Sequence, residues 1–438
     1  MNLNQLTHEC HLHLYGCLHH EDLWALGAER LSRFKDRVAW FKSEHLRLTG
    51  KDVDPETWWQ GGDGKDRFKA AFLCDRSLPF DHFQARFNLL IALFPPSPDD
   101  MELARAVFSR DSKSHGIKEY RTFLPLYLPE NERNRYLRNL IGTALSFQNP
   151  DWKPLFAVSF PRGNDETWQA WNFLREFLAA NPDLSQYISG IDFCGSERGH
   201  PPASKRPFIS EVHRYRGPRD RRLEVLYHVG EMWDDIALHS AARWCVEAAG
   251  MGVRRLGHAL ALGLDARNLR DRTIMESVSS VSEHFVWMRH NAATLHESGF
   301  SSVDAARLSD LAEQCRVGSW IAWHYSDRLI DLTTRFQEAL LAIIARRDVY
   351  IECCPTSNIR IGGLRDAAGH PLRRFLRHGI KVTVSTDDPG IFAVDLAHEE
   401  RICREVLGLN NDAIATLNQT ALCVLTNQDE FSRHRRHL

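Results

Sequence analysis

Short apolar runs alternate with longer amphipathic segments along most of the chain. Eight of the runs have the length and the β-branched or aromatic content of strands, and each is followed by a segment whose apolar residues have helical spacing. They lie near residues 9–14, 116–123, 155–160, 187–194, 224–228, 253–257, 348–353 and 380–386. Strands that alternate with helices favour a parallel sheet. Eight such units fit a closed (β/α)8 TIM barrel, so we predict an α/β protein of this fold class.

Two segments are longer than a minimal barrel requires. Residues 17 to about 114 contain amphipathic stretches, which predict extra N-terminal helices that cap the barrel mouth. Residues 264–347, between the sixth and seventh strands, contain several helix-like runs where one helix would suffice. We interpret them as a helical insertion within a single domain, 1–438. This insertion could be a lid, a specificity element, an oligomer contact or a buried extra helix pair, and we favour a lid or a homo-oligomer contact.

The composition is that of a protein with a large core and little charge bias. The 438 residues are 43% hydrophobic and 26% charged, with a formal net charge of −2. This balance gives no electrostatic bias toward nucleic acid or a membrane, so we expect a small-molecule substrate. The first residues lack a basic start and a long apolar run, which predicts a cytoplasmic protein. Ten cysteines without a Cys-x-x-Cys pair predict reduced core residues.

Residues that bind metals lie at the ends of several predicted strands. His11 and His13 alternate on the first strand, so their side chains should point to the same face. His228 ends the fifth strand and Asp387 follows the last. With 22 histidines in the chain, a chance His-x-His is the alternative interpretation of the first pair. Three imidazoles and one carboxylate suit a borderline ion, and we predict one zinc ion per chain on these four residues.

Two more residues near strand ends predict acid–base chemistry. Glu231 follows His228 by three positions, and His258 ends the sixth strand. A divalent ion lowers the pKa of a bound water molecule to roughly 7, which makes that water a nucleophile. We therefore expect Glu231 to move a proton to the substrate and His258 to orient or deprotonate the water.

The motifs taken together resemble those of the adenosine deaminase family, within the metal-dependent amidohydrolase superfamily. The matching segments occur in the family's order: His11-Leu-His13-Leu-Tyr-Gly16, Ile191-Asp-Phe-Cys-Gly195-Ser-Glu197, His228-Val-Gly-Glu231, Arg255-Leu-Gly-His258, Cys354-Pro-Thr-Ser-Asn358 with His370-Pro371, and Ser385-Thr-Asp-Asp-Pro389. The resemblance covers residues 8 to about 425, apart from the insertion. Each motif is weak by itself, but the ordered series is specific.

The resemblance implies a role for each matching residue. It places zinc on His11, His13, His228 and Asp387. It makes Glu231 the proton donor to the purine N1 and has His258 hold the attacking hydroxide. It also implies that Asp388 bonds the purine N7 and that the backbone of Gly195 meets N3. Attack at C6 with loss of ammonia would turn an adenine into a hypoxanthine. A dinuclear class of amidohydrolase uses a modified lysine on the fourth strand. The fourth predicted strand of this chain contains no lysine, which favours one metal ion over two.

The departures from the family pattern concern the part of the substrate beyond the purine ring. Position 15 is Tyr where the resemblance leads us to expect an acidic residue that bonds the sugar 5′-hydroxyl. Loss of that charge removes one barrier to a 5′-phosphate, and we expect Tyr15 to bind substrate. The basic stretch 198–206, which includes Lys205 and Arg206, could hold a phosphate or be a solvated loop. Four aromatic residues could line a purine pocket or pack in the core, and we favour the core: Trp58, Trp59, Phe83 and Phe87.

The leading hypothesis is a cytoplasmic zinc hydrolase that deaminates an adenine nucleoside or its 5′-phosphate. Its discriminating feature is the set Glu231, His258 and Asp388 beside the metal ligands. One alternative is a mononuclear amidohydrolase that acts on another amino-purine or a cyclic amide. The other is a deaminase-fold scaffold protein in which the inserted helices build an assembly. Neither ribose nor deoxyribose is favoured by the sequence.

Overall fold

Eight parallel strands form the central sheet of a computed structural model that describes residues 4–233 and 235–426. They are β1 (Glu9–His13), β2 (Gly116–Phe123), β3 (Trp152–Phe160), β4 (Ile188–Phe193), β5 (Glu224–Val229), β6 (Arg255–His258), β10 (Tyr350–Cys353) and β11 (Lys381–Val384). Neighbours in the sheet follow the order β1-β2-β3-β4-β5-β6-β10-β11. The predicted (β/α)8 barrel is confirmed, and each predicted strand overlaps an observed one.

The barrel closes where its first and last strands meet. Leu12 and Asp387 form a parallel bridge. The His13 amide donates a hydrogen bond of 2.9 Å to the carbonyl of Asp387, and the Asp387 amide donates one of 3.1 Å to the carbonyl of His11. Closure therefore brings the two ends of the chain together at one point of the rim.

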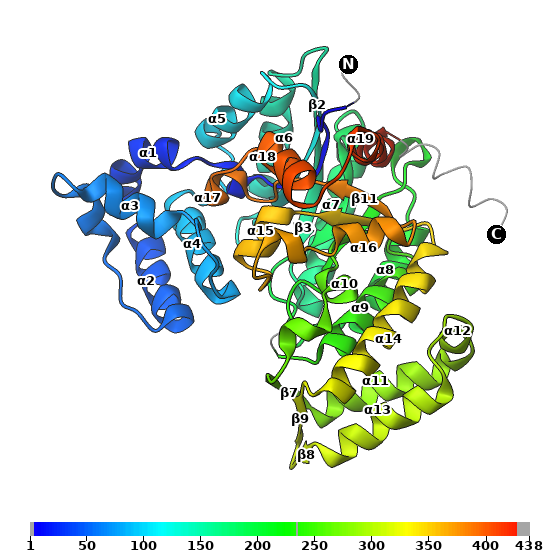
Figure 1. Ribbon diagram of the computed structural model, residues 1–438. Coiled ribbons are helices and arrows are strands. Elements are labelled where there is room, and N and C mark those ends of the chain that lie inside the picture. The colour runs from blue at the N-terminus through cyan, green and yellow to red at the C-terminus, as the bar shows by residue number, and fades with distance from the viewer. Residues whose placement is uncertain (1–3, 234, 427–438) are drawn as a thin grey trace.

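Helices surround the strands and bury their outer faces (Figure 1). The barrel layer contains α6 (Glu130–Leu145), α7 (Asn164–Ala180), α8 (Arg206–Arg214), α9 (Leu238–Gly250), α10 (Leu260–Gly263), α14 (Asp327–Ala345), α16 (Leu372–Arg377) and α19 (Asn411–Thr426). The small residues of α9 allow close packing, and almost the whole helix is buried between the strands and α14. Short helices follow the last two strands: α15 (Pro355–Arg360), α17 (Pro389–Phe392) and α18 (Leu396–Arg401).

The predicted N-terminal helices are present. They are α1 (His20–Arg33), α2 (Lys35–Thr49), α3 (Gly64–Phe72), α4 (Phe80–Leu93) and α5 (Glu102–Asp111). Helices α1 to α3 project to one side of the barrel, and α4 lies between them and the barrel (Figure 1). Trp59 stacks on Trp24 with ring centroids 5.0 Å apart, and Trp58 packs against Phe68, so both tryptophans belong to the core of this helical group.

The insertion between β6 and β10 differs from the prediction of a helical segment. It contains α11 (Val278–His290), α12 (Ala292–Glu297) and α13 (Ser302–Gln314), but also a three-stranded antiparallel sheet of β7 (Thr273–Ser277), β9 (Trp320–His324) and β8 (Arg316–Val317). Ile274 and Trp323 are buried in this sheet, whereas Met275 and Trp320 are exposed. Apolar and polar residues that alternate over so few positions are difficult to recognise as strands between helical segments. Because α14 packs on α9 and α10, it serves as the barrel helix of this unit.

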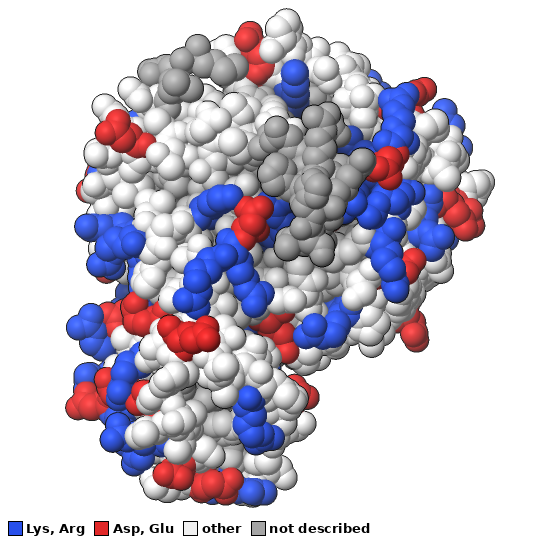
Figure 2. All heavy atoms as spheres, turned by 90° about the vertical axis from the view of Figure 1, so that its right-hand side faces the viewer, with Lys and Arg blue, Asp and Glu red and all other residues white. Residues whose placement is uncertain are grey.

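The surface and the cysteines agree with the composition. Figure 2 shows the insertion as a lower lobe and Lys, Arg, Asp and Glu side chains interspersed over that face of the molecule. All ten cysteines are free thiols, as predicted. Within the described ranges, no helix combines the length and the apolar character needed to cross a bilayer. Self-association through 264–347 stays a prediction.

Candidate metal centre and active site

Four side chains from the first, fifth and last strands converge at the rim of the barrel. The Nε2 atom of His228 lies 3.0 Å from Nε2 of His11 and 3.2 Å from Nε2 of His13. Oδ1 of Asp387 lies 3.4 Å and 3.3 Å from the same two nitrogens. All four side chains are buried. Residues near the start, in the middle and near the end of the chain thus present their donor atoms to one point.

The spacing of these donor atoms fits a metal ion. Around a tetrahedral ion with bonds of roughly 2.0–2.1 Å, neighbouring ligand atoms are about 3.4 Å apart. Imidazole lone pairs facing each other at this distance repel unless a cation lies between them. Oδ1 of Asp387 is buried and has no hydrogen-bond partner among the described residues. The donor set therefore suits a first-row divalent ion. His258 is also close, since ligand atoms of His11, His228, His258 and Asp387 all lie within 4.8 Å of one another, a group that does not include His13.

Two buried carboxylates orient the imidazoles. Nδ1 of His11 lies 3.0 Å from Oε2 of Glu352, and Nδ1 of His228 lies 3.1 Å from Oδ1 of Asp192. A carboxylate accepts the Nδ1 proton, which leaves the Nε2 lone pair free for a metal ion. Burial raises the pKa of Glu352, but the arginines inside the barrel, Arg255 and Arg121, outweigh it and hold that pKa well below its usual range. Glu352 is therefore an anion that only accepts.

A chain of hydrogen bonds assigns the tautomer of His258. The Leu372 amide donates to Nδ1 of His370 at 3.1 Å, so Nε2 of His370 carries its proton and donates to Oδ1 of Asn358 at 2.9 Å. The Asn358 amide nitrogen then faces Nδ1 of His258 at 2.9 Å and donates to it. Burial holds the pKa of His258 well below its usual value. Neutral His258 therefore carries its proton on Nε2 and presents a donor to the site.

His258 and Glu231 face each other beside the metal ligands. Nε2 of His258 lies 3.6 Å from Oε1 of Glu231 and 3.9 Å from Oδ2 of Asp387. His258 and Asp387 both adopt left-handed backbone conformations, with φ of 61° and 65°. Non-glycine residues in this region cost energy and cluster at functional sites. These bends turn two side chains toward the centre of the barrel rim.

Glu231 sits on a turn that another carboxylate holds in place. Glu197 accepts backbone N–H bonds from Gly230 at 2.8 Å, from Glu231 at 2.9 Å and from Met232 at 3.0 Å. Burial raises the pKa of Glu231 well above its usual value, and the negative charges of Asp387 and Glu197 raise it further. The direction of this shift favours the protonated carboxyl, which can donate a proton.

Asp388 has a similar environment next to the metal ligand Asp387. Burial raises its pKa well above the usual value, and the charge of Asp387 adds to this. Gly16 allows the Asp388 side chain to lie close to the chain after β1, since a Cβ atom at position 16 would be 1.7 Å from Oδ1 of Asp388. The glycine of the His11–Gly16 motif therefore makes room for the second aspartate.

The cluster lies at the bottom of a cavity of about 330 Å³. Helix α4 forms one wall with a single face, because the lining positions follow helical spacing: Phe80, Phe83, Gln84, Phe87 and Ile91. The other lining residues are His13, Phe123, Leu124, Ser159, Phe160, Pro161, Cys194, Gly195, His228, Glu231, His258, Ile361, Asp387 and Asp388. Our expectation that Phe83 and Phe87 belong to the core was incomplete, since both are buried and also line this cavity.

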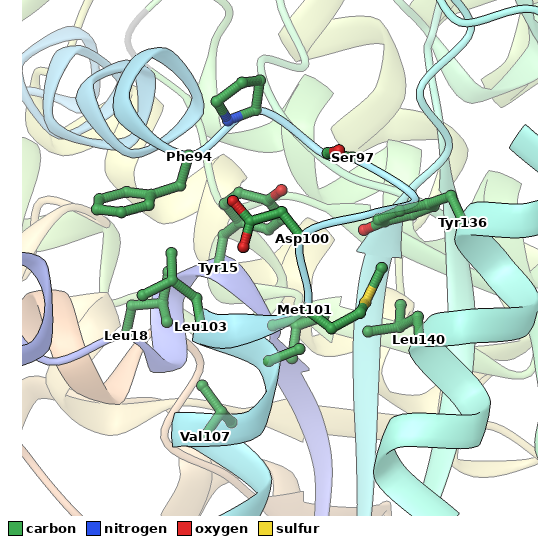
Figure 3. A pocket seen from close by; sticks show the side chains of 13 residues that line it. Tyr15, Leu18, Phe94, Ser97, Asp100, Met101, Leu103, Val107, Tyr136 and Leu140 are labelled. Atoms are coloured by element: carbon green, nitrogen blue, oxygen red, sulfur yellow. The ribbon is translucent and has the colours of Figure 1, made fainter. Parts of the chain in front are cut away.

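Tyr15 is not among the residues that line this cavity. Its side chain lines a smaller, apolar cavity of about 40 Å³, together with Asp100 and Tyr136 (Figure 3). The backbone enters a 3-10 turn at Tyr15, directly after β1, and this turn directs the ring away from the metal ligands. Gly195, by contrast, lies in the wall of the main cavity.

The basic loop after β4 does not supply a phosphate site in the cavity. Lys205 is buried, and its ammonium donates to Oδ1 of Asn164 at 2.8 Å and to Oγ1 of Thr167 at 3.2 Å. Arg206 lines a different surface hollow, beside Arg243 and Arg347. Of the two interpretations left open for this loop, phosphate binding gains no support from this placement, since neither Lys205 nor Arg206 lines the cavity.

Comparisons with known proteins find similarity to one family. A family model described as adenosine deaminase matches residues 301–431. An adenosine deaminase from Escherichia coli O1:K1 is 37% identical over 94 residues, which are 21% of this chain and 28% of the relative. This part of the chain is therefore similar to the adenosine deaminase family. Because the alignment spans little more than a quarter of the curated relatives, this similarity alone does not establish an activity or a substrate.

Solved structures of deaminases share the fold. The adenine deaminase from Arthrobacter aurescens is 16% identical, with a TM-score of 0.53, over 98% of this chain and 99% of the other. The N6-methyl-AMP deaminase from Arabidopsis thaliana is 15% identical, with a TM-score of 0.55, over 99% and 96%. These likenesses extend across the barrel, including the N-terminal part that the family model does not match.

Several residues of the site carried a signal in the sequence that we did not interpret. Asp192 and Glu352 are carboxylates within apolar strand runs, where a charged residue needs a buried partner. Asn358 and His370 stand in matched motifs, but their link to His258 depends on contacts between distant loops. Nothing in the local sequence assigns Glu197 to the turn that carries Glu231.

Proposed function

We propose that this protein is a zinc-dependent hydrolase that deaminates an adenine nucleoside or its 5′-phosphate at C6 of the purine. Water adds its oxygen to C6, the exocyclic amine leaves as ammonia, and the ring becomes a hypoxanthine. The observation that carries the proposal is a buried carboxyl, Glu231, which lies 3.6 Å from His258 and beside a buried group of candidate metal donors in a ligand-sized cavity. Similarity to the adenosine deaminase family supports the same reaction class.

The residues that would hold the zinc ion are His11, His13, His228 and Asp387. Three nitrogens and one oxygen are a donor set typical of zinc, and the cavity leaves one side of the cluster open. When bound, the ion would supply a nucleophile at neutral pH by lowering the pKa of a water molecule to roughly 7. Glu352 and Asp192 keep two of the imidazoles in the tautomer that binds metal.

Glu231, His258 and Asp388 would act on the substrate and on the attacking oxygen. Protonated Glu231 donates to N1, which draws electrons from C6 and favours attack there. His258 donates from Nε2 and holds the incoming oxygen, because its tautomer makes it a donor and not a base. Asp388 in its protonated form donates to N7, which is an acceptor. Gly195 lies in the cavity wall, and its backbone amide would meet N3.

The proposal is tested by a substrate panel on one purified, zinc-loaded sample. Ammonia release and the change in purine absorbance should occur with at least one of adenine, adenosine, 2′-deoxyadenosine and AMP, and metal analysis should give one zinc ion per chain. If none of these compounds is deaminated while zinc is bound, the proposed reaction is wrong.

A second candidate is a mononuclear amidohydrolase for another amino-purine or a cyclic amide. The observation that favours it is that Tyr15 packs behind the cavity-lining Phe123 and does not itself line the cavity, which leaves the expected sugar contact without a residue. A non-enzymatic scaffold is disfavoured, since a protein that only binds ligand has no need of a protonated Glu231 beside metal donors.

A further inference from the structure

The outer part of the cavity is apolar. Five phenylalanines line it: Phe80, Phe83, Phe87, Phe123 and Phe160. The other hydrophobic residues in the lining are Ile91, Leu124, Pro161 and Ile361. The catalytic polar groups occupy the inner end. A substrate that places its purine ring at the metal cluster therefore extends its substituent along the face of α4.

We propose that the site takes a neutral amino-purine whose substituent is apolar or only weakly polar, and that it discriminates against a 5′-phosphate. This inference rests on the proposed deamination, which places the purine ring at the inner end. It narrows the substrate class within the nucleoside and nucleotide candidates.

The cations near the cavity are already engaged. Arg162 donates to the carbonyls of Phe193, at 3.2 Å, and His228, at 2.8 Å. Arg198 pairs with Asp81 at 3.2 Å at the start of α4. Among the described residues that line the cavity, none is Lys or Arg. A phosphate in the outer part of the cavity would therefore exchange water for phenylalanine rings without a compensating cation.

Sugar hydroxyls also find few partners. Apart from the inner polar groups, the side chains that offer hydrogen bonds are Gln84, Ser159 and Cys194, and the Gln84 amide already donates to Asn88 at 2.9 Å. Tyr15 contacts Tyr136 in the smaller cavity. A site without matching partners leaves the substrate's hydroxyls unpaired, and each unpaired buried group reduces affinity by about tenfold.

The experiment measures binding and turnover across a graded series. The ligands are 9-ethyladenine, 2′-deoxyadenosine, adenosine and AMP, titrated by calorimetry into the metal-free and the zinc-loaded full chain, with kcat/KM measured in parallel. We expect affinity to fall in that order, with AMP at least tenfold weaker than 9-ethyladenine in both metal states. Equal or tighter binding of AMP in the metal-free chain overturns the inference.

A matched pair of variants tests whether the substituent of the substrate contacts α4. Gln84→Lys adds a cation to the wall, and Gln84→Met has a similar length without charge. Relative to 9-ethyladenine, the lysine variant should bind AMP at least fivefold more tightly than the methionine variant does. If the two variants bind AMP equally, the substituent does not contact α4 and the inference fails. Absence of turnover with the binding order preserved would reject the proposed reaction but retain the selectivity.

Discussion

The two additions to the barrel, the N-terminal helices and the insertion 264–347, look alike in sequence but differ in what they do for the site. Both are amphipathic segments of similar length between barrel strands. Helix α4 of the first forms a wall of the cavity, whereas the insertion supplies none of the described residues that line it. Its place on the side of the barrel gives no support to the expected lid role (Figure 1). Whether an added segment lies at the cavity therefore depends on which part of the barrel it is bound to, and not on its being helical.

Backbone hydrogen bonds anchor the segment before α4 to the catalytic rim. The Cys74 amide donates to the carbonyl of Ile391 at 2.9 Å, and the Leu78 amide donates to the carbonyl of Arg360 at 2.8 Å. Both acceptors lie in short helices that follow the last barrel strands. The ion pair of Arg198 with Asp81 adds a third tie at the start of α4. These contacts hold the aromatic face of α4 over the metal donors.

The insertion is anchored to the outer helices instead. Its buried Glu276 accepts hydrogen bonds from Trp323 within the insertion, at 2.9 Å, and from Ser240 on α9, at 3.2 Å. Met275, Val317 and Trp320 remain exposed on its sheet. It therefore stabilises the side of the barrel and presents its own surface to solvent.

The largest expected loss of turnover comes from a change in the barrel itself. It is the reference against which changes in the two additions are compared. Glu231→Gln should keep its metal but lose turnover by a thousandfold or more, on the order of what general acid catalysis contributes, because proton delivery disappears. Metal analysis and ammonia release check this. Asp387→Ala serves as the contrast, since it should lose metal and activity together. Near-normal turnover in the glutamine variant would remove Glu231 from the mechanism.

The next effect concerns the loops to which the α4 segment is tied. Asn358→Asp replaces a donor to His258 with an acceptor, so Nδ1 of His258 should take the proton and Nε2 should become a lone pair. We expect kcat to fall about a hundredfold with little change in KM. Nitrogen-15 NMR of the histidine rings reports the tautomer directly. An unchanged tautomer with reduced kcat would mean that Asn358 acts by packing alone.

A matched pair of core truncations compares the two additions directly. Phe87 on α4 and Phe300 in the insertion are both buried phenylalanines, and each change to alanine should cost about 3–5 kcal/mol of folding stability. Only Phe87→Ala should also lower kcat/KM, by about tenfold per folded molecule, because it opens the cavity wall. Denaturant unfolding and kinetics on the same samples separate the effects. Equal kinetic losses in both variants would contradict the comparison.

The smallest effect is on the pH dependence. The active form of Glu231 is protonated and its pKa is raised, so activity should be present at low and neutral pH and fall as the pH rises through that pKa. The charge of Glu197 contributes to the raised pKa, so Glu197→Gln should move the basic limb of kcat/KM to lower pH. Variants of the insertion should leave the limb unchanged. If the basic limb of the Glu197→Gln variant moved to higher pH, the charge of Glu197 would not be what raises the pKa of Glu231.

Much of the fold was predictable because its signals are local. Each barrel strand is a short apolar run followed by a helical pattern, and both periodicities follow from backbone geometry alone. The small sheet of the insertion was not predicted, since two of its strands alternate over only five residues and owe their pairing to each other. Short strands are stabilised by cross-strand contacts, which no local pattern contains.

The sequence by itself determined which residues meet at the rim of the barrel, because the end of a barrel strand is a fixed place and His11, His13, His228, His258 and Asp387 lie at or just after such ends. Tertiary structure decided what surrounds them. The direction of Tyr15 depends on a turn, and the burial of Lys205 depends on two partners from α7. The tautomer of His258 depends on its hydrogen bond to Asn358, which is 100 positions away along the chain. Side-chain direction and hydrogen-bond partners are set by packing between distant segments, and one-dimensional patterns do not record them.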